Sequence, residues 1–150
     1  MTVILSIDPG GLRLGETGIA VGYIDDTTPY ELVDTYAVPD NLDGFRMWYY
    51  ALVPGRTYDV VVCEKWVDRN IPGADRSAML IEGAVRFMWP KVVLQPASGK
   101  NTAVSDLVLK RLGAYTAGGH HHDILEATRH GVWYCKKQRH LPTLRKGWQK

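Results

Sequence analysis

The chain has little cysteine, and it lacks both a paired-cysteine motif and a long apolar run. Its two cysteines, Cys63 after "VVV" and Cys135 after "VWY", are expected to be buried, reduced thiols of a cytoplasmic protein, with a disulfide as the alternative. Without a CxxC pair, the sequence does not favour a structural zinc site. No segment approaches the ~20 apolar residues of a membrane span. The start, "MTVILSIDPGG", has no basic region of a signal peptide. We therefore expect a cytoplasmic protein without a membrane segment.

Acidic residues are missing from the end of the chain. The last fifteen residues, "KKQRHLPTLRKGWQK", hold six of the 18 Lys and Arg residues and no Asp or Glu. The rest therefore has 12 basic residues against 16 acidic ones, although the formal net charge of the whole chain is +2. A basic end on a mildly acidic body favours a polyanionic partner. A solvated, disordered end is the alternative.

The hydrophobic pattern predicts one α/β domain, and 150 residues are enough to bury a core. Three short β-branched runs at residues 2–8, 17–25 and 31–38 are expected to form an antiparallel meander. Two later apolar runs, 59–64 and 91–96, have the length of buried strands. Helices are expected at 41–53, at 76–89, at 103–113 with Gly113 as its C-cap, and from about His122 onward. This order predicts a mixed sheet flanked by helices.

Two predicted strands end in an acid, Asp8 after "ILSI" and Glu64 after "VVVC". An ionised carboxylate at the end of an apolar strand is costly unless another group neutralises it. Functional sites of open α/β sheets also tend to lie at the carboxyl ends of strands. The alternatives are that Asp8 begins the "DPGG" turn and that Glu64 pairs with Lys65 or Arg69.

The last predicted helix adds two further acids. At ~100° per residue, Asp123, Glu126 and His130 fall on one face. Two carboxylates one turn apart repel each other unless a cation lies between them. Stabilisation by the start of the helix would explain Asp123 but not Glu126. Four acids from two strand ends and one helix suit Mg²⁺ or Mn²⁺. The opposite face is apolar and must pack, with Gly131 permitting close approach to the sheet: Ile124, Leu125, Thr128, Val132 and Cys135.

The run of three histidines before these acids does not form a metal site by itself. Consecutive side chains on a helix point ~100° apart and cannot converge on one ion. We expect His120 and His121 to belong to the loop opened by two glycines. His122 and His130 could reach the edge of the acidic site and orient a water or a phosphate.

With these residues placed, the chain resembles the RuvC-type Holliday-junction resolvases of the ribonuclease H-like superfamily. The resemblance runs from about Thr2 to Tyr134 and is closest to the short versions that bacteriophages carry. Its motifs are "ILSIDPG…TGIAV", "VVCE", "SAMLIEGAVR" and "HDILEATRHGVWY". Two features depart from the family pattern. Glu126 stands where aspartate is usual, and the loop "PGGLRLGE" is longer than usual.

The resemblance implies a central five-stranded mixed sheet and a Mg²⁺-dependent endonuclease that acts as a homodimer on branched DNA. It implies two ions in each active site, with Mn²⁺ as a substitute, no small organic cofactor, and products with 5′-phosphate and 3′-hydroxyl ends. The nuclease domain would span residues 1–137, followed by a basic tail, 138–150. The protein would act in the bacterial cytoplasm, encoded by a bacterium or by a phage. The alternatives are a superfamily nuclease that cuts RNA–DNA hybrids or processes rRNA, and a non-catalytic junction-binding protein.

Residue roles follow from the same motifs. The catalytic and metal-binding acids would be Asp8, Glu64, Asp123 and Glu126. Phosphate or transition-state stabilisation is expected from Lys100, Lys110 and His130, with solvated helix lysines as the alternative for the first two. Trp66 would act as a DNA wedge, or else as a core or interface tryptophan. The remaining candidate DNA-binding residues are Arg69, Arg129, Lys136, Lys137, Arg139, Arg145 and Lys146.

Overall fold

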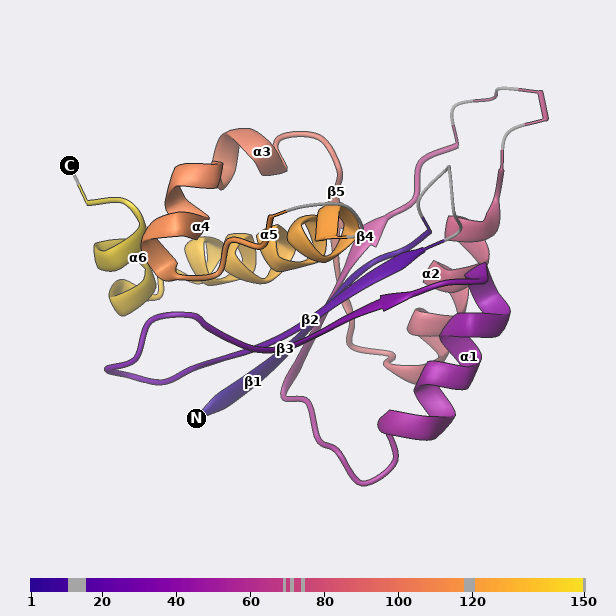
Figure 1. The fold of residues 1–150 in the computed structure, drawn as a ribbon, viewed down its shortest axis with the longest axis horizontal. Coiled ribbons are helices and arrows are strands. Elements are labelled where there is room, and N and C mark those ends of the chain that lie inside the picture. The colour runs from indigo at the N-terminus through magenta and orange to yellow at the C-terminus, as the bar shows by residue number, and fades with distance from the viewer. Residues whose placement is uncertain (11–15, 69, 71, 74, 118–120, 150) are drawn as a thin grey trace.

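The fold is a single mixed sheet with helices on both faces (Figure 1). A computed structural model describes residues 1–10, 16–68, 70, 72–73, 75–117 and 121–149. The sheet has five strands in the order β3-β2-β1-β4-β5. The first three strands pair antiparallel, whereas β4 runs parallel to β1 and β5 parallel to β4. The strands are β1 (Thr2–Asp8), β2 (Thr17–Ile24), β3 (Glu31–Val38), β4 (Val60–Lys65) and β5 (Val93–Pro96). The predicted meander and five-stranded mixed sheet are therefore confirmed.

The helices form two layers. The first layer, α1 and α2, covers one face of the sheet, and α5 covers the other face, where α3, α4 and α6 surround it (Figure 1). Their bounds are α1 (Asn41–Leu52), α2 (Ser77–Met88), α3 (Lys100–Ala103), α4 (Asp106–Leu112), α5 (His121–Lys137) and α6 (Leu141–Gly147).

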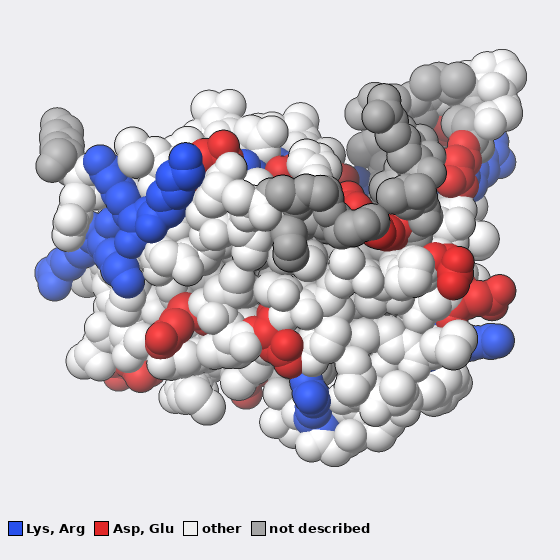
Figure 2. All heavy atoms as spheres, viewed as in Figure 1, with Lys and Arg blue, Asp and Glu red and all other residues white. Residues whose placement is uncertain are grey.

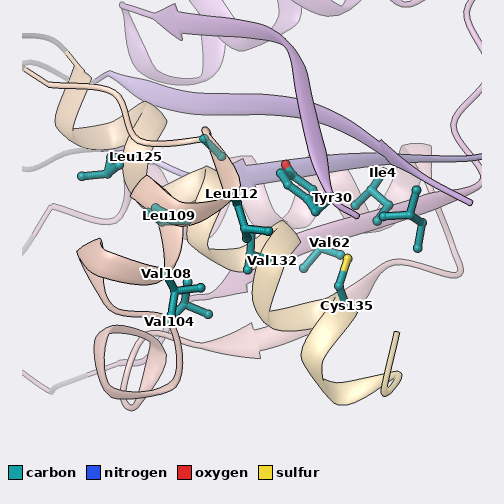
Figure 3. Packing of buried hydrophobic residues seen from close by; sticks show 12 residues of the cluster. Ile4, Tyr30, Val62, Val104, Val108, Leu109, Leu112, Leu125, Val132 and Cys135 are labelled. Atoms are coloured by element: carbon teal, nitrogen blue, oxygen red, sulfur yellow. The ribbon is translucent and has the colours of Figure 1, made fainter. Parts of the chain in front are cut away.

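Each face of the sheet has its own apolar core because side chains alternate along a strand. Ile4 and Val62 belong to the core beneath α4 and α5, which Figure 3 shows from close by. Their neighbours Leu5 and Val61 belong to the core beneath α1 and α2. Both central strands are thus apolar on both faces, which explains why they read as continuous apolar runs.

The helix expected over 103–113 is shorter than predicted. It is divided in two, because Val104 is extended (φ −134°, ψ 92°) and separates α3 from α4. The carbonyl oxygen of Val104 accepts a hydrogen bond from Arg129 (2.6 Å) at this break. Ser105 then caps α4 through its side chain. Gly113 ends that helix with φ 76°, as expected for a C-cap.

The C-terminal basic segment is not a disordered end. Within residues 138–149, α6 packs against α4 and α5. Thr143 is fully buried and accepts a hydrogen bond from the Tyr30 main-chain nitrogen (2.8 Å). Gly147 is also buried, and a Cβ added there would lie 3.1 Å from Val108. The basic residues are therefore attached to a folded helix.

The structure bears on two expectations about the whole chain, the state of its cysteines and the lack of a membrane span. Cys63 and Cys135 are both free and buried, so the disulfide alternative is wrong. Burial raises the pKa of the Cys63 thiol well above its ordinary value. In the part of the chain described, no helix is both long and apolar enough to cross a membrane. The cytoplasmic location stays a prediction.

Candidate active site

The carboxylates of Asp8 and Glu64 belong to neighbouring strand ends. β1 and β4 pair in parallel up to Ile7 and Cys63, the residues immediately before the two acids. Because side chains alternate along a strand, both acids face the side of the sheet that α5 covers. The prediction that these two acids meet at one edge of the sheet is confirmed.

Two glycines let α5 come close enough to bring its acids to the same edge. Gly18 lies opposite Asp8 in the β1–β2 ladder, and a Cβ added to it would lie 1.9 Å from the main-chain oxygen of Asp123. A Cβ added to Gly131 would lie 2.6 Å from Ser6 Oγ on β1. Close approach at Gly131 was predicted. The equally important role of Gly18 was not.

Lys100, the first residue of α3, lies between two of the four acids. Its Nζ atom is 2.5 Å from Glu64 Oε2 and 2.8 Å from Glu126 Oε2. Only 10% of this lysine side chain is exposed, so the alternative of a solvated helix lysine is wrong. The partner of Glu64 is this lysine rather than Lys65, the neighbour considered from the sequence. Lys100 therefore supplies the positive charge that the acidic site requires.

Arg129 also holds one of the acids, and this corrects its expected role in DNA binding. Its guanidinium group donates to Glu126 Oε1 (3.0 Å) and to the Val104 carbonyl oxygen (2.6 Å), and it pairs with Asp106. Only 6% of the side chain is exposed. These partners hold the guanidinium group inside the protein. It anchors Glu126 rather than presenting its charge to a phosphate.

His130 reaches the site from inside the core. Its Nε2 atom lies 2.9 Å from Glu64 Oε2, and its Nδ1 atom lies 2.8 Å from Gln95 Oε1. The ring is fully buried and stacks on Trp133. Burial lowers its pKa. His130 therefore does not contact an incoming phosphate directly, as one of its predicted roles required. It contacts Glu64.

The pKa shifts of the acids divide them into two pairs. Burial raises the pKa of Asp8 well above its ordinary value, and repulsion from Glu64, Asp123 and Glu126 adds to this effect. Burial likewise raises the pKa of Asp123. Burial alone would also raise the pKa of Glu64, but hydrogen bonds from His130 and Lys100 lower it to about 2. The pKa of Glu126 is lowered against burial by Lys100 and Arg129.

The charges of these acids thus influence one another, but the four carboxylates do not form a preformed metal site. Among the residues that the structure describes, no three acidic, histidine or cysteine side chains converge closely enough to hold an ion. The ammonium group of Lys100 lies between Glu64 and Glu126 instead. The donor set nevertheless fits a hard divalent cation, because it consists of carboxylate oxygens and includes the half-buried Asp8.

Several other predicted site residues lie elsewhere. Lys110 is exposed on α4 with its ammonium group over the Tyr115 ring. Lys136 donates to the Ala103 carbonyl oxygen (3.0 Å). Arg69 and His120 lie outside the described residues, as does the side chain of His121. Trp66 directly follows β4 and is half-buried, whereas His122 is exposed at the start of α5.

The remaining basic residues form a surface group at the end of the molecule that contains α6. We define the α6 basic group as Arg139, Arg145 and Lys146, all of which are exposed; Lys137, the last residue of α5, is exposed too. Figure 2 shows Lys and Arg side chains gathered at this end. The group lies beyond the C-terminal end of α5, whereas the acids of α5 lie in its first two turns.

Sequence reasoning missed two buried polar residues near the end of β4. Gln95 is fully buried on β5 opposite Glu64, inside an otherwise apolar run. Glu82 is buried on α2 and accepts a hydrogen bond from the main-chain nitrogen of Trp66 (2.5 Å), just beyond β4. A polar residue within an apolar segment was the available signal in both cases.

The sheet order and the position of the acids define the class of fold. A five-stranded mixed sheet, with acids at the ends of two central strands and on the helix over them, is a ribonuclease H-like α/β fold, as expected. No protein-family model and no curated protein matches the sequence.

Solved structures place the fold among the Holliday-junction resolvases. The chain is similar to Thermus thermophilus RuvC in complex with a Holliday junction substrate, with a TM-score of 0.68 and 15% sequence identity over 95% of this chain and 98% of that chain. It is also similar to the fowlpox virus Holliday junction resolvase, with a TM-score of 0.58 and 17% identity over 91% of this chain and 99% of that chain. The chain therefore has the fold of a RuvC-type resolvase over nearly its whole length.

Proposed function

We propose that this protein is a Mg²⁺-dependent endonuclease that resolves four-way DNA junctions. The observation that supports this most directly is the position of Asp8 and Glu64 at adjacent strand ends beneath the acids of α5. Similar structures include a RuvC and a poxvirus resolvase, each in complex with a Holliday junction. The retained acids argue against a non-catalytic junction-binding protein, because such a protein has no use for their mutual repulsion.

In this proposal Asp8, Glu64, Asp123 and Glu126 hold two divalent ions. Bound ions of this kind activate water and stabilise the leaving oxygen when a phosphodiester is hydrolysed. Asp8 would suit a position shared by both ions, because its charge interacts with the strand acid Glu64 and with both acids of the helix. The expected products carry 5′-phosphate and 3′-hydroxyl ends.

Lys100 has a separate role in the proposal. In the protein without metal, its ammonium group neutralises Glu64 and Glu126 and so keeps the acids together. Its position beside these two ligands also suits it to stabilise negative charge on the phosphate that is being cut. Lys110 takes no part, because it is exposed and lies over the Tyr115 ring.

A second surface would bind a DNA arm away from the scissile phosphate. Along α5, the ~1.5 Å rise per residue separates Asp123 from Lys137 by about 21 Å. The α6 basic group lies beyond that point and would contact the backbone of the duplex without reading its sequence. Symmetric cleavage of both strands further requires two active sites, so we propose a homodimer.

The test is cleavage of an immobile four-way junction with Mg²⁺, with each strand labelled in turn. We expect paired incisions at symmetric positions and no cleavage after chelation with EDTA. An RNA–DNA hybrid of the same sequence serves as the comparison substrate. Efficient cleavage of the hybrid with an intact junction would replace this proposal with a ribonuclease H activity. Scattered single nicks would instead indicate a general nuclease for branched DNA.

A further inference from the structure

One oxygen of the Glu64 carboxylate is held by His130 of α5 and Lys100 of α3, and Gln95 of β5 contacts the histidine in turn. Gln95 on β5 lies opposite Glu64 in the parallel β4–β5 pair, so both side chains point to the same face of the sheet. His130 belongs to α5, which covers this face of the sheet. The ring joins the two, with Nε2 2.9 Å from Glu64 Oε2 and Nδ1 2.8 Å from Gln95 Oε1.

The direction of these contacts follows from the chemistry of the groups. The Glu64 carboxylate forms an ion pair with the ammonium group of Lys100, and a carboxylate in such a pair can only accept hydrogen bonds. His130 Nε2 must therefore carry the proton and donate it to Oε2. The Gln95 side chain can present either its oxygen or its amide group, so it can complete the contact at Nδ1 in either protonation state of the ring.

The two oxygens of Glu64 consequently have different surroundings. Oε2 accepts a hydrogen bond from His130 and forms the ion pair with Lys100. Among the residues that the structure describes, the hydrogen bonds to this carboxylate all go to Oε2 and none goes to Oε1. A carboxylate fixed through one oxygen in this way presents the other oxygen in a defined direction.

We propose that His130 and Gln95 are positioning residues, which hold Glu64 so that its Oε1 atom is presented to a divalent cation. This inference rests on the proposed function, because it concerns the same site. A free glutamate side chain loses considerable rotamer entropy when it binds an ion, and a fixed one has already lost it. Groups that orient metal ligands in this manner typically change metal affinity by about 10-fold to 100-fold.

The burial of the pair supports a task beyond filling the core. His130 and Gln95 are both fully buried, and placing polar side chains in the core costs free energy unless each is hydrogen-bonded. Only one end of the Gln95 amide is hydrogen-bonded, to His130 Nδ1, and the other end has no partner among the described residues. Two apolar side chains of similar volume would avoid that cost. Stability alone therefore does not explain why polar residues occupy these two positions.

The test is Mn²⁺ binding to the DNA-free protein, measured by titration calorimetry. We expect His130→Leu to weaken Mn²⁺ binding by about 10-fold to 100-fold and Gln95→Leu to weaken it less. The conservative variant His130→Gln should recover part of the loss, since its amide can still donate to Glu64. The matched control is His140→Leu, because His140 is a half-buried histidine that contacts Thr143 and the Asp25 carbonyl oxygen instead.

A double-mutant cycle separates positioning from general damage. In a Glu64→Ala background, adding His130→Leu should not weaken Mn²⁺ binding further, because the residue acts only through Glu64. An equal loss with and without Glu64, or unchanged binding in the single variant, would overturn the inference. If His130→Leu does not fold, Gln95→Leu and His130→Gln take its place in the cycle. Absence of Mn²⁺ binding by the unmodified protein would instead contradict the proposed function itself.

Discussion

The ammonium group of Lys100 lies 2.5 Å from the Oε2 atom of Glu64, although the two residues are 36 positions apart in the chain. This contact is largely shielded from water, since 10% of the lysine side chain and 20% of the glutamate side chain are exposed. Burial would lower the pKa of Lys100, but the surrounding acids raise it to about 12. The site therefore contains a permanent cation of its own, in contact with two of the predicted metal ligands.

Replacing that cation tests its role directly. Lys100→Met keeps the apolar stem of the side chain but leaves Glu64 and Glu126 without their shared partner. Breaking a buried ion pair in this way costs about 3–5 kcal/mol, so we expect a loss of that order in the free energy of unfolding without metal. Added Ca²⁺ should restore more stability to the variant than it adds to the unmodified protein, because the cation neutralises the acids. Thermal unfolding with and without Ca²⁺ measures both effects.

Lys110→Met is the matched control for this experiment. Lys110 is exposed on α4, so its replacement should change the free energy of unfolding by no more than about 0.5 kcal/mol. Equal destabilisation by the two substitutions would contradict the assignment of Lys100 to the site.

Asp8→Asn should abolish junction cleavage while leaving the fold and junction binding intact. The amide preserves the shape of the side chain at the end of β1 but removes the charge that a bridging ligand needs. Binding measured in Ca²⁺, which we expect to support binding without turnover, should match that of the unmodified protein. Cleavage by this variant at the rate of the unmodified protein would show that Asp8 is not the bridging ligand.

Cation binding should become tighter as the pH rises through the pKa of Asp8. Burial and repulsion from neighbouring acids raise this pKa well above 3.8, so below it the folded protein without metal retains a proton on this carboxyl. A cation that binds to Asp8 must displace this proton, and affinity therefore falls as pH decreases and levels off above the pKa. Mn²⁺ titrations in two buffers with different ionisation enthalpies would detect the released proton. No proton release at any pH below neutrality would contradict the assignment.

The α6 basic group should contribute to DNA affinity through charge alone. Deletion of residues 138–150 would remove a packed helix, so substitution is the cleaner test. Arg139→Gln combined with Arg145→Gln should reduce the slope of log K against log salt concentration by up to about 0.9 for each lost phosphate contact. Arg46→Gln combined with Lys91→Gln, which removes two exposed charges elsewhere, should leave the slope unchanged. An unchanged slope in the α6 variant would remove this surface from the DNA-binding proposal.

The elements of the site could be predicted because local patterns reveal them. Continuous apolar runs ending in Asp8 and Glu64 predict two buried strands whose ends carry acids. Helical periodicity places Asp123 and Glu126 on one face of α5. These inferences need only the repeat of each element, since the direction of a side chain relative to its own strand or helix is a local property. Gly131 could likewise be assigned to close packing from its place on that helix.

The break between α3 and α4 was not predictable in the same way. Apolar spacing alone favours one helix over 103–113. In the structure Val104 is extended, and its carbonyl oxygen accepts a hydrogen bond from Arg129, which lies 25 positions further along the chain. The same buried arginine was interpreted from the sequence as a surface cation, since composition does not reveal which charges have a partner inside the fold.

The sequence by itself determined the succession of the five strands along the chain, the presence of four acids, and the element on which each acid lies. Only the tertiary structure decided that Lys100 neutralises two of them, that Gly18 admits the start of α5, and that His130 secures Glu64. The physical reason is distance along the chain. His130 and Glu64 are 66 positions apart, and a repeat within one element carries no information about which side chain a distant element will bring against it.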